Sequence, residues 1–362
     1  MKVCFLLSDI TKVGGIERVT STLVNEFICN KEINVEIVSL FKGRSAPGYP
    51  IAENIPIHYL KHDAHGATPH SLKRAINMFS TLSLVRKFLK KHNYDVVVVQ
   101  SFPPALLSFF SGFNRKKIIV AEHVYAEYYG NIINKFRTLI YSKFGKIVVL
   151  TTNDLKFFQC SGIGEKVTVI PNPVLPSNEP KSTCDNKRII TVGRLVYQKG
   201  FDNLIKAFKP ISEHHPDWKL DIYGDGPLKS DLENLINEYH LKEKVNLCGL
   251  SSQIPKEFST SSIFVMSSHF EGFPMVLIEA LTQGVPCISF DCPNGPSDII
   301  KNGVNGLLVE NQNIHDLANA IELLIKNDNE RKRLGNNAPD SIKQFSKDII
   351  IKKWYELFES IK

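Results

Sequence analysis

The sequence predicts an α/β protein built from two doubly wound domains that face a cleft. Strand-length apolar runs alternate with helical patterns along the chain, and a proline-rich stretch near the middle interrupts the alternation. The length of 362 residues also exceeds what one hydrophobic core usually holds. We therefore expect an N-terminal domain over residues 1–175 and a C-terminal domain over residues 176–347.

The first half shows the βαβ pattern of a parallel sheet covered on both faces. Strand-like runs are expected at residues 3–7, 35–40, 95–99, 117–121 and 146–150. After the first run, Gly14 and Gly15 precede an amphipathic helix that starts near Ile16. Such a glycine pair lets a ligand approach the backbone at a helix N-terminus, although a plain turn would look the same. The spacing is not GxGxxG, so the dinucleotide-binding fingerprint is absent.

Positive charge is concentrated in the first half. Residues 1–176 hold 22 Lys/Arg and 12 Asp/Glu, a balance of +10, whereas the remainder has a balance of −3. A helical stretch between Thr68 and His92 contains the basic residues Lys73, Arg74, Arg86, Lys87, Lys90 and Lys91. They could rest on anionic lipid or bind the phosphates of a lipid-linked substrate, or they could form a solvated helix face. A nucleic-acid partner is not expected, because no binding module is recognisable.

The composition favours a cytoplasmic protein without a membrane span. No apolar run reaches the roughly 20 residues that a spanning helix requires. The apolar run at the start is too short for a signal peptide and is better interpreted as a strand. The seven cysteines include no CxxC pair and mostly lie in or beside apolar runs, which favours reduced thiols over disulfides or a zinc site.

His123 is the first candidate for a functional side chain. It directly follows the expected strand at residues 117–121, at the sheet edge where open α/β sheets bind ligands. An imidazole can donate or accept a hydrogen bond near neutral pH. The alternative is a loop histidine without a role.

The segment from Val167 to Pro180 holds four prolines within ten residues, so it is interpreted as the interdomain linker. After it the alternation resumes. Strands are expected at residues 188–192, 219–223, 244–248, 262–266 and 285–290.

Two loops of the second half combine basic and acidic side chains. Arg194 and Lys199 follow the first of these strands and could neutralise a diphosphate together, although the segment is not a P-loop. Glu271 lies in the loop after the strand at residues 262–266, and Glu279 follows eight residues later in an apolar helix. The first backbone N–H groups of that helix, from about Phe273 onward, could bind an anion, and an ordinary strand-to-helix turn is the alternative.

With these features in place, the chain resembles the family-four retaining glycosyltransferases of the GT-B fold, among them bacterial enzymes that extend lipid-linked or lipopolysaccharide glycans. The motifs that carry the resemblance are GGIER, VGRLVYQKG, YGDGP, EGFPMVLIE, GVPCIS and NGVNGLLV, in this order. It implies that the terminal helix, about residues 348–362, crosses back onto the first domain. The first domain would then bind the acceptor and the second the nucleotide sugar.

The resemblance also implies residue roles. The catalytic residues would be His123, Glu271, Arg194 and Lys199. The donor-binding residues would be Gly14, Gly15, Arg194, Lys199, Phe273, Pro274, Met275, Val276 and Glu279. Asp298 occupies a place where many members have Glu, which leaves its role open.

The expected reaction moves a hexose or N-acetylhexosamine from a nucleoside-diphosphate sugar, with UDP-sugar preferred, to a lipid-linked or surface-polysaccharide glycan. No cofactor or metal is expected, since Arg, Lys and a helix N-terminus would supply the positive charge; the lone Asp225 is weak support for a metal. The enzyme would work at the inner face of the cell membrane. Alternatives are a nucleotide-sugar epimerase of similar two-domain fold, a glycosyltransferase acting on a soluble acceptor, and a non-enzymatic nucleotide-sugar binder.

Overall fold

The computed structural model describes residues 1–64 and 72–361. The chain divides into two compact units, one formed by Met1–Pro173 with Asp348–Lys362 and the other by Val174–Lys347. The boundary expected after residue 175 lies two residues from this division. The final helix belongs to the first unit, as expected for a segment that crosses back.

The described residues of the first unit form a seven-stranded parallel sheet in the order β3-β2-β1-β4-β5-β6-β7. Its strands are β1 Lys2–Leu7, β2 Asn34–Ser39, β3 Ile57–Tyr59, β4 Val96–Gln100, β5 Ile118–Ala121, β6 Lys146–Val149 and β7 Val167–Val169. The chain builds outward from β1 to β3 and then returns to place β4 on the other side of β1. The topological switch point of this sheet therefore lies between β1 and β4.

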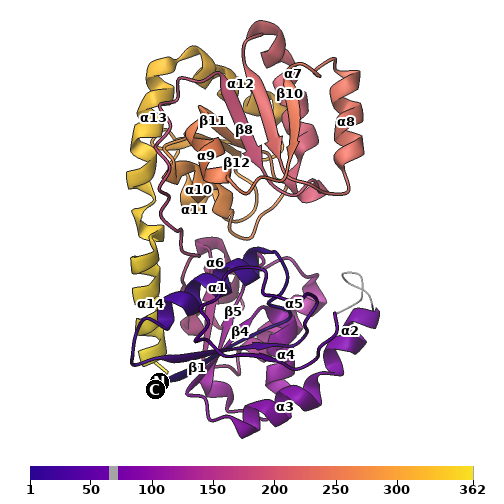
Figure 1. Ribbon diagram of the computed structural model, residues 1–362, viewed down its shortest axis with the longest axis vertical. Coiled ribbons are helices and arrows are strands. Elements are labelled where there is room, and N and C mark those ends of the chain that lie inside the picture. Colours follow the sequence, from indigo (N-terminus) through magenta and orange to yellow (C-terminus); the bar gives the residue numbers. More distant parts are fainter. Residues whose placement is uncertain (65–71, 362) are drawn as a thin grey trace. The chain divides into compact units, whose positions relative to one another are not determined.

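Helices cover both faces of this sheet (Figure 1). They are α1 Gly15–Phe27, α2 Leu72–Phe79, α3 Leu82–Lys91, α4 Phe102–Phe110, α5 Asn131–Tyr141, α6 Thr152–Cys160 and α14 Lys347–Glu359. Alternate residues of β1 feed the two cores: Val3 and Phe5 pack with α1 and α14, whereas Cys4 and Leu6 pack with α2 to α6. This alternation follows from the period of two in a β-strand.

The terminal helix α14 is held against α1 by aromatic contacts. The rings of Phe27 and Phe358 lie 5.3 Å apart, and Trp354 contacts both Phe5 and Phe358. Trp354 and Phe358 are buried and form the apolar face of this helix. Burial of aromatic surface of this size is a main source of helix docking energy.

The second unit contains a six-stranded parallel sheet in the order β10-β9-β8-β11-β12-β13. Its strands are β8 Arg188–Val192, β9 Lys219–Tyr223, β10 Val245–Gly249, β11 Ile263–Met266, β12 Cys287–Phe290 and β13 Gly306–Val309. Its helices are α7 Phe201–His214, α8 Lys229–Glu238, α9 Ile254–Ser259, α10 Met275–Thr282, α11 Pro296–Ile299, α12 Ile314–Lys326 and α13 Asp328–Ser341. The switch point of this sheet lies between β8 and β11.

The structure corrects three sequence-based expectations. The predicted linker begins with β7, because Val167–Val169 precede the first proline and pair at the sheet edge with β6. The single basic helical stretch is divided into α2 and α3, with a break at Ser80 and Thr81, and its residues 68–71 lie outside the described part. The helix after Lys199, expected from the sequence over Phe201–Phe208, is α7 and continues through Pro210 to His214, where buried Ile211 keeps the last turn on the core.

No helix within residues 1–64 and 72–361 combines the length and apolar character needed to cross a membrane.

Candidate active site

The switch point of the second sheet brings two candidate loops together. β8 and β11 are hydrogen-bonded neighbours, and the connections that follow them leave in opposite directions. Open α/β sheets bind ligands in the crevice that such a divergence creates at the carboxyl ends of the strands. Lys199 lies in the loop after β8, within the 3₁₀ turn Tyr197–Lys199, and Glu271 lies in the loop after β11.

Lys199 and Glu271 form an ion pair at this edge. The Lys199 Nζ lies 2.6 Å from Glu271 Oε1, and the two side chains are 17% and 7% exposed. Ser268 Oγ also donates to Glu271 Oε1 at 2.6 Å. Gln198 Nε2 donates to the other carboxylate oxygen, Oε2, at 3.5 Å. The carboxylate is thus fixed by three donors, while the partly exposed ammonium, which has three N–H groups, can still reach a ligand.

Contacts between the two loops fix the position of the pair. His269 N–H donates to Gln198 O at 2.8 Å, and Ser267 Oγ donates to Lys199 O at 3.0 Å. The rings of Tyr197 and His269 stack with centroids 4.3 Å apart. Gly200 has a φ of 57°, and a Cβ there would come within 2.2 Å of Ser267 O. Only glycine therefore allows the loops to approach this closely.

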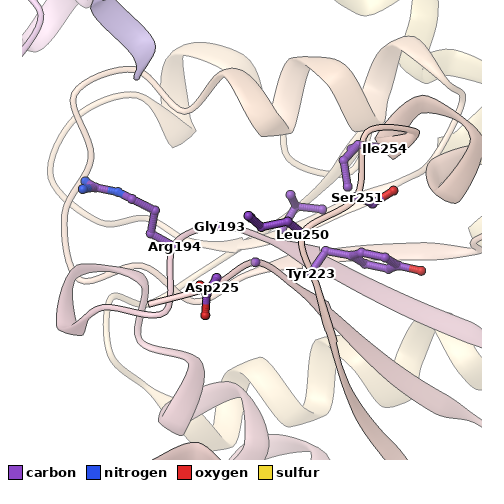
Figure 2. A pocket seen from close by; sticks show the side chains of 9 residues that line it. Gly193, Arg194, Tyr223, Asp225, Leu250, Ser251 and Ile254 are labelled. Carbon is purple, nitrogen blue, oxygen red and sulfur yellow. The ribbon is translucent and has the colours of Figure 1, made fainter. Parts of the chain in front are cut away.

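A pocket of about 210 Å³ adjoins the pair. It is lined by Val192, Gly193, Arg194, Tyr223, Gly224, Asp225, Leu250, Ser251 and Ile254, all at or after the carboxyl ends of β8, β9 and β10. Figure 2 shows Leu250 and Ile254 grouped together, with the Arg194 side chain extending away from them. The stem of Lys199 packs over Gly193, because a Cβ there would meet three of its carbons within 3.2–3.3 Å. The pocket, Arg194 and Lys199 therefore form one continuous surface.

Leu250, Ser251 and Ile254 were not predicted as site residues. Their only sequence signal is their place directly after β10, at the same edge as the VGRLVYQKG loop. Strand order was needed to bring that edge together, since β10 is separated from β8 by β9.

The predicted anion site at α10 is less regular than expected. Pro274 has no N–H, Met275 N–H donates to Phe273 O at 2.9 Å, and Leu277 N–H donates to Pro274 O at 3.0 Å. The run therefore offers the amides of Phe273 and Val276 instead of a continuous row of donors. Glu279 lies half-buried in the middle of α10.

The surroundings of Asp225 do not indicate a metal site. Within the described residues, no group of three or more His, Cys, Asp or Glu side chains is placed to hold a metal ion. Asp225 instead lies in a turn that packs on the neighbouring loop, where its carbonyl accepts a hydrogen bond from Leu195 N–H at 2.9 Å.

In the first unit, His123 directly follows β5 and is hydrogen-bonded through Nε2 to Gln100 Oε1, at the end of β4. Burial lowers the pKa of His123 to about 4. The imidazole is therefore neutral at physiological pH.

A buried network that the sequence did not reveal holds the His123 loop. Glu122 Oε2 lies 3.3 Å from an Arg137 guanidinium nitrogen and accepts from Tyr141 Oη at 2.6 Å. Arg137, on α5, is fully buried and also donates to the Ala126 carbonyl. Asp154 Oδ1 accepts from Ala126 N–H at 2.7 Å. Burial raises the pKa of the Glu122 carboxyl, which Arg137 and Tyr141 oppose by stabilising the anion.

Gly14 and Gly15 lie at the N-terminus of α1, with Gly14 as the N-cap. A side chain at position 14 would meet Glu17 Oε2, because a Cβ there would lie 2.6 Å from it. Glu17 is buried, and burial raises the pKa of its carboxyl. This helix terminus therefore carries its own acidic group, a feature that the glycine pair alone did not predict.

The predicted basic surface residues lie on α2 and α3. Lys73, Arg86, Lys87, Lys90 and Lys91 are exposed. Arg74 lies in α2, and its side chain is outside the described part.

Two family models match consecutive parts of the chain. The model described as Glycosyltransferase Family 4 matches residues 13–177, and the model described as Glycosyl transferases group 1 matches residues 177–341. Together they span both units.

Relatives match over the full length of the chain. It is 30% identical to the amylovoran biosynthesis glycosyltransferase AmsD of Erwinia amylovora, over 98% of this chain and 99% of the relative. It is 28% identical, over 100% and 99%, to an α-1,4-N-acetyl-D-galactosaminyltransferase of Campylobacter jejuni named for a PP-undecaprenol-linked glycan. An exopolysaccharide phosphotransferase of Streptomyces coelicolor is 30% identical, but the chain spans only 41% of its length.

Solved structures share the architecture. The lipopolysaccharide outer core galactosyltransferase WaaB superimposes with a TM-score of 0.78 at 23% identity, covering 99% of both chains. HepE of Anabaena, solved in complex with UDP, gives a TM-score of 0.78 at 18% identity, covering 99% of this chain and 100% of that one. Both likenesses establish the fold. The two family models and the full-length match to AmsD show that this chain is a glycosyltransferase of family 4 and group 1, and the solved structures show that it has the GT-B fold.

Proposed function

We propose that this protein transfers a hexose or N-acetylhexosamine from a UDP-sugar to a lipid-linked or surface-polysaccharide glycan, with retention of anomeric configuration. The observation that carries the proposal is the Lys199–Glu271 ion pair at the switch point of the second sheet, next to the pocket that Arg194 helps to line. Family membership supports the reaction class. The relatives named for polysaccharide and PP-undecaprenol glycans support the class of acceptor.

The donor is assigned to the second unit. We place the nucleobase in the pocket between Tyr223, Leu250 and Ile254, since an apolar wall suits a flat ring. The diphosphate then extends past Gly193 toward Arg194 and Lys199, where two cations offset its charge. Glu279 is assigned to the ribose hydroxyls and Glu271 to hydroxyls of the transferred sugar. Support for UDP comes from the complex of HepE, a protein of the same fold.

Lys199 has a double task in this arrangement. Its ammonium neutralises Glu271 and, through its remaining N–H groups, contacts the β-phosphate. Negative charge grows on that phosphate as the bond to the anomeric carbon breaks, and a fixed cation stabilises it most in the transition state. Arg194 is exposed and would order on binding the donor.

The reaction balances without a cofactor. The bond between the anomeric carbon and the diphosphate oxygen breaks, the acceptor hydroxyl oxygen bonds to the same carbon, and its proton passes to the leaving phosphate. His123 is neutral, so we assign it to a hydrogen bond with the donor sugar and not to charge neutralisation. Arg and Lys supply the positive charge, and metal independence is part of the proposal.

A screen of nucleotide sugars tests the function. Purified protein is incubated with UDP-, GDP- and dTDP-sugars, with and without a bacterial lipid extract, and nucleoside diphosphate release is measured. We expect UDP release that increases with the extract, and an α-linked product by NMR from an α-linked donor.

Other outcomes would contradict specific parts. Sugar interconversion without nucleotide release would indicate an epimerase. Transfer to free oligosaccharides that is unaffected by the extract would replace the lipid-linked acceptor with a soluble one. Inverted product would reject retention, and loss of activity on adding EDTA would reject metal independence.

A further inference from the structure

Helix α5 exposes four large apolar side chains to solvent, although two of its polar side chains are buried in the core. On the outer face, Ile132 is 86% exposed, Leu139 60% and Phe136 46%. Their spacing of four and three residues places them on one stripe of the helix. On the inner face, Asn134 and Arg137 are buried together with Ile140 and Tyr141. A helix that covers a sheet usually exposes polar side chains, so the exposed apolar stripe is unusual.

The burial of Arg137 has a clear cause on the inner side. Arg137 must face inward because it pairs with the buried Glu122 and binds the Ala126 carbonyl. The buried network around Arg137 does not require apolar residues on the solvent-facing side of α5. Polar residues on that side would be equally compatible with the helix. Contiguous exposed apolar surface is uncommon on soluble proteins and marks a contact with another body.

The apolar exposure is concentrated in one layer of the first unit. Eight of its ten exposed large apolar side chains among the described residues lie on α2, α4, α5 or the turn before α5: Ile76, Phe79, Phe110, Tyr128, Ile132, Ile133, Phe136 and Leu139. Val13 and Ile349 are the other two. The layer formed by α2 to α5 shares one core against the sheet, and α3–α4 and α4–α5 are direct neighbours.

The positive charge of the first half lies in the same segment. From Leu72 to Val149 the chain has 13 Lys/Arg and 3 Asp/Glu, a balance of +10. The rest of residues 1–176 has 9 of each, a balance of zero. A surface that is both apolar and strongly basic matches an anionic bilayer, because lipid tails accept the apolar side chains and headgroups attract the cations.

We propose that the α2–α5 layer is a membrane-docking surface, and that the α5 stripe of Ile132, Ile133, Phe136 and Leu139 enters the headgroup region of an anionic bilayer. The inference rests on the proposed function in one respect, because a lipid-linked acceptor explains why the protein would bind a membrane. The exposure and the charge from which the surface is argued do not depend on that function. A protein partner would need acidic groups to complement this basic surface. A second copy of the chain could not supply them from the same surface, which has almost no acidic residues.

Docking through α5 also positions the chemistry. The helix follows directly after the loop that carries His123, and its inner side holds that loop through Arg137 and Glu122. One helix therefore contacts the bilayer with one face and fixes the His123 loop with the other. An acceptor anchored in the same bilayer would arrive beside that loop.

Vesicle co-sedimentation tests the surface without donor or acceptor. The full chain is mixed with phosphatidylcholine vesicles with or without phosphatidylglycerol. We expect binding that requires phosphatidylglycerol and weakens with added salt. The double variant Ile132→Glu/Phe136→Glu should partition at least about tenfold less, since each change places a charge where an apolar side chain enters lipid. Ile349→Glu on α14, an exposed apolar residue of the other layer, is the matched control and should bind like wild type.

Each result separates the two proposals. Equal binding of the double variant and wild type, or no binding of wild type, would overturn the docking surface even if nucleotide release is normal. A wild-type dimer that becomes monomeric in the double variant would replace the bilayer with a second copy. Vesicle binding without nucleotide release from any donor would instead reject the catalytic proposal alone. Circular dichroism of the double variant confirms that it is folded.

Discussion

Each unit has a glutamate just beyond the carboxyl end of a parallel strand, paired with a cation, and the two pairs differ in exposure. Glu122 and Arg137 in the first unit are 1% and 0% exposed. Glu271 and Lys199 in the second unit are 7% and 17% exposed, next to an open pocket and the exposed Arg194. The chemistry of the groups is similar, so exposure decides what each pair can do.

The buried pair can only support structure. Arg137 is enclosed by the rings of Tyr129, Tyr141 and Phe158, whose centroids lie 5.2, 5.8 and 5.4 Å from its guanidinium carbon. The accessible pair can exchange its partners with a ligand. A buried ion pair is costly to break and gives little net stability when intact, whereas a partly exposed pair costs less to rearrange.

The largest expected effect is on stability, at the buried pair. Arg137→Met should lower the free energy of unfolding by roughly 3–5 kcal/mol, because Glu122 would remain buried without its cation. Urea denaturation followed by circular dichroism measures this. Arg86→Met, at an exposed arginine of α3, is the control and should change stability by less than about 0.5 kcal/mol. If both variants unfold at the same urea concentration, the buried pair does not hold the loop.

The next effect is on turnover, at the accessible pair. Lys199→Ala should reduce kcat by about 100- to 1000-fold, as expected when a fixed charge opposite a leaving group is removed. Its unfolding free energy should change by only about 1 kcal/mol, since Ser268 still donates to Glu271 at an edge open to water. Nucleoside diphosphate release measures turnover. Lys206→Ala, which removes a surface pair with Asp202, should leave turnover within about twofold. If Lys199→Ala lost as much stability as Arg137→Met, the two ion pairs would not differ in their structural role.

The smallest expected effect is on the pH dependence of stability, through His123, which follows Glu122 of the buried pair in the chain. His123 has a folded pKa of about 4, below the value of about 6.5 in an unfolded chain. The unfolded state therefore binds the extra proton first, and His123 makes the native state less stable as pH falls from about 6.5 to about 4.

The variant His123→Gln should remove that part of the acid sensitivity. We expect a smaller difference between urea midpoints at neutral pH and near pH 4.5 than in wild type. His62→Gln, at an exposed histidine, should leave the difference unchanged. Identical pH dependence in wild type and His123→Gln would mean that His123 titrates normally in the folded protein.

Much of the fold could be predicted from sequence because its strands are buried on both faces. Continuous apolar runs such as Val96–Val99 identify such strands, and all ten predicted strands are present within one or two residues. The three that were missed, β3, β7 and β13, are short strands at or near sheet edges, where partial burial weakens the apolar signal. The prolines that follow β7 also concealed it inside the predicted linker.

In the candidate site, too, some residues could be predicted from the sequence and others could not. Arg194, Lys199 and Glu271 could be selected from sequence because charged residues directly after strands must lie at one sheet edge. The pocket residues Leu250 and Ile254 could not, because they are ordinary apolar residues until strand order places β10 near β8. The missing donor at Pro274 follows from the sequence, but the hydrogen bonds that occupy the Met275 and Leu277 amides became visible only in the structure.

The sequence by itself determined the two α/β units, the sheet edge at which the candidate residues of each unit lie, and the excess of positive charge in the first half. Periodicity and the order of strand, loop and helix are local properties, so they can be seen along the chain. Only the tertiary structure decided which ion pair is enclosed and which is open, and that α5 places Arg137 inside and Ile132 and Phe136 outside. Exposure depends on what packs against a side chain from distant parts of the sequence, and no local pattern contains that information.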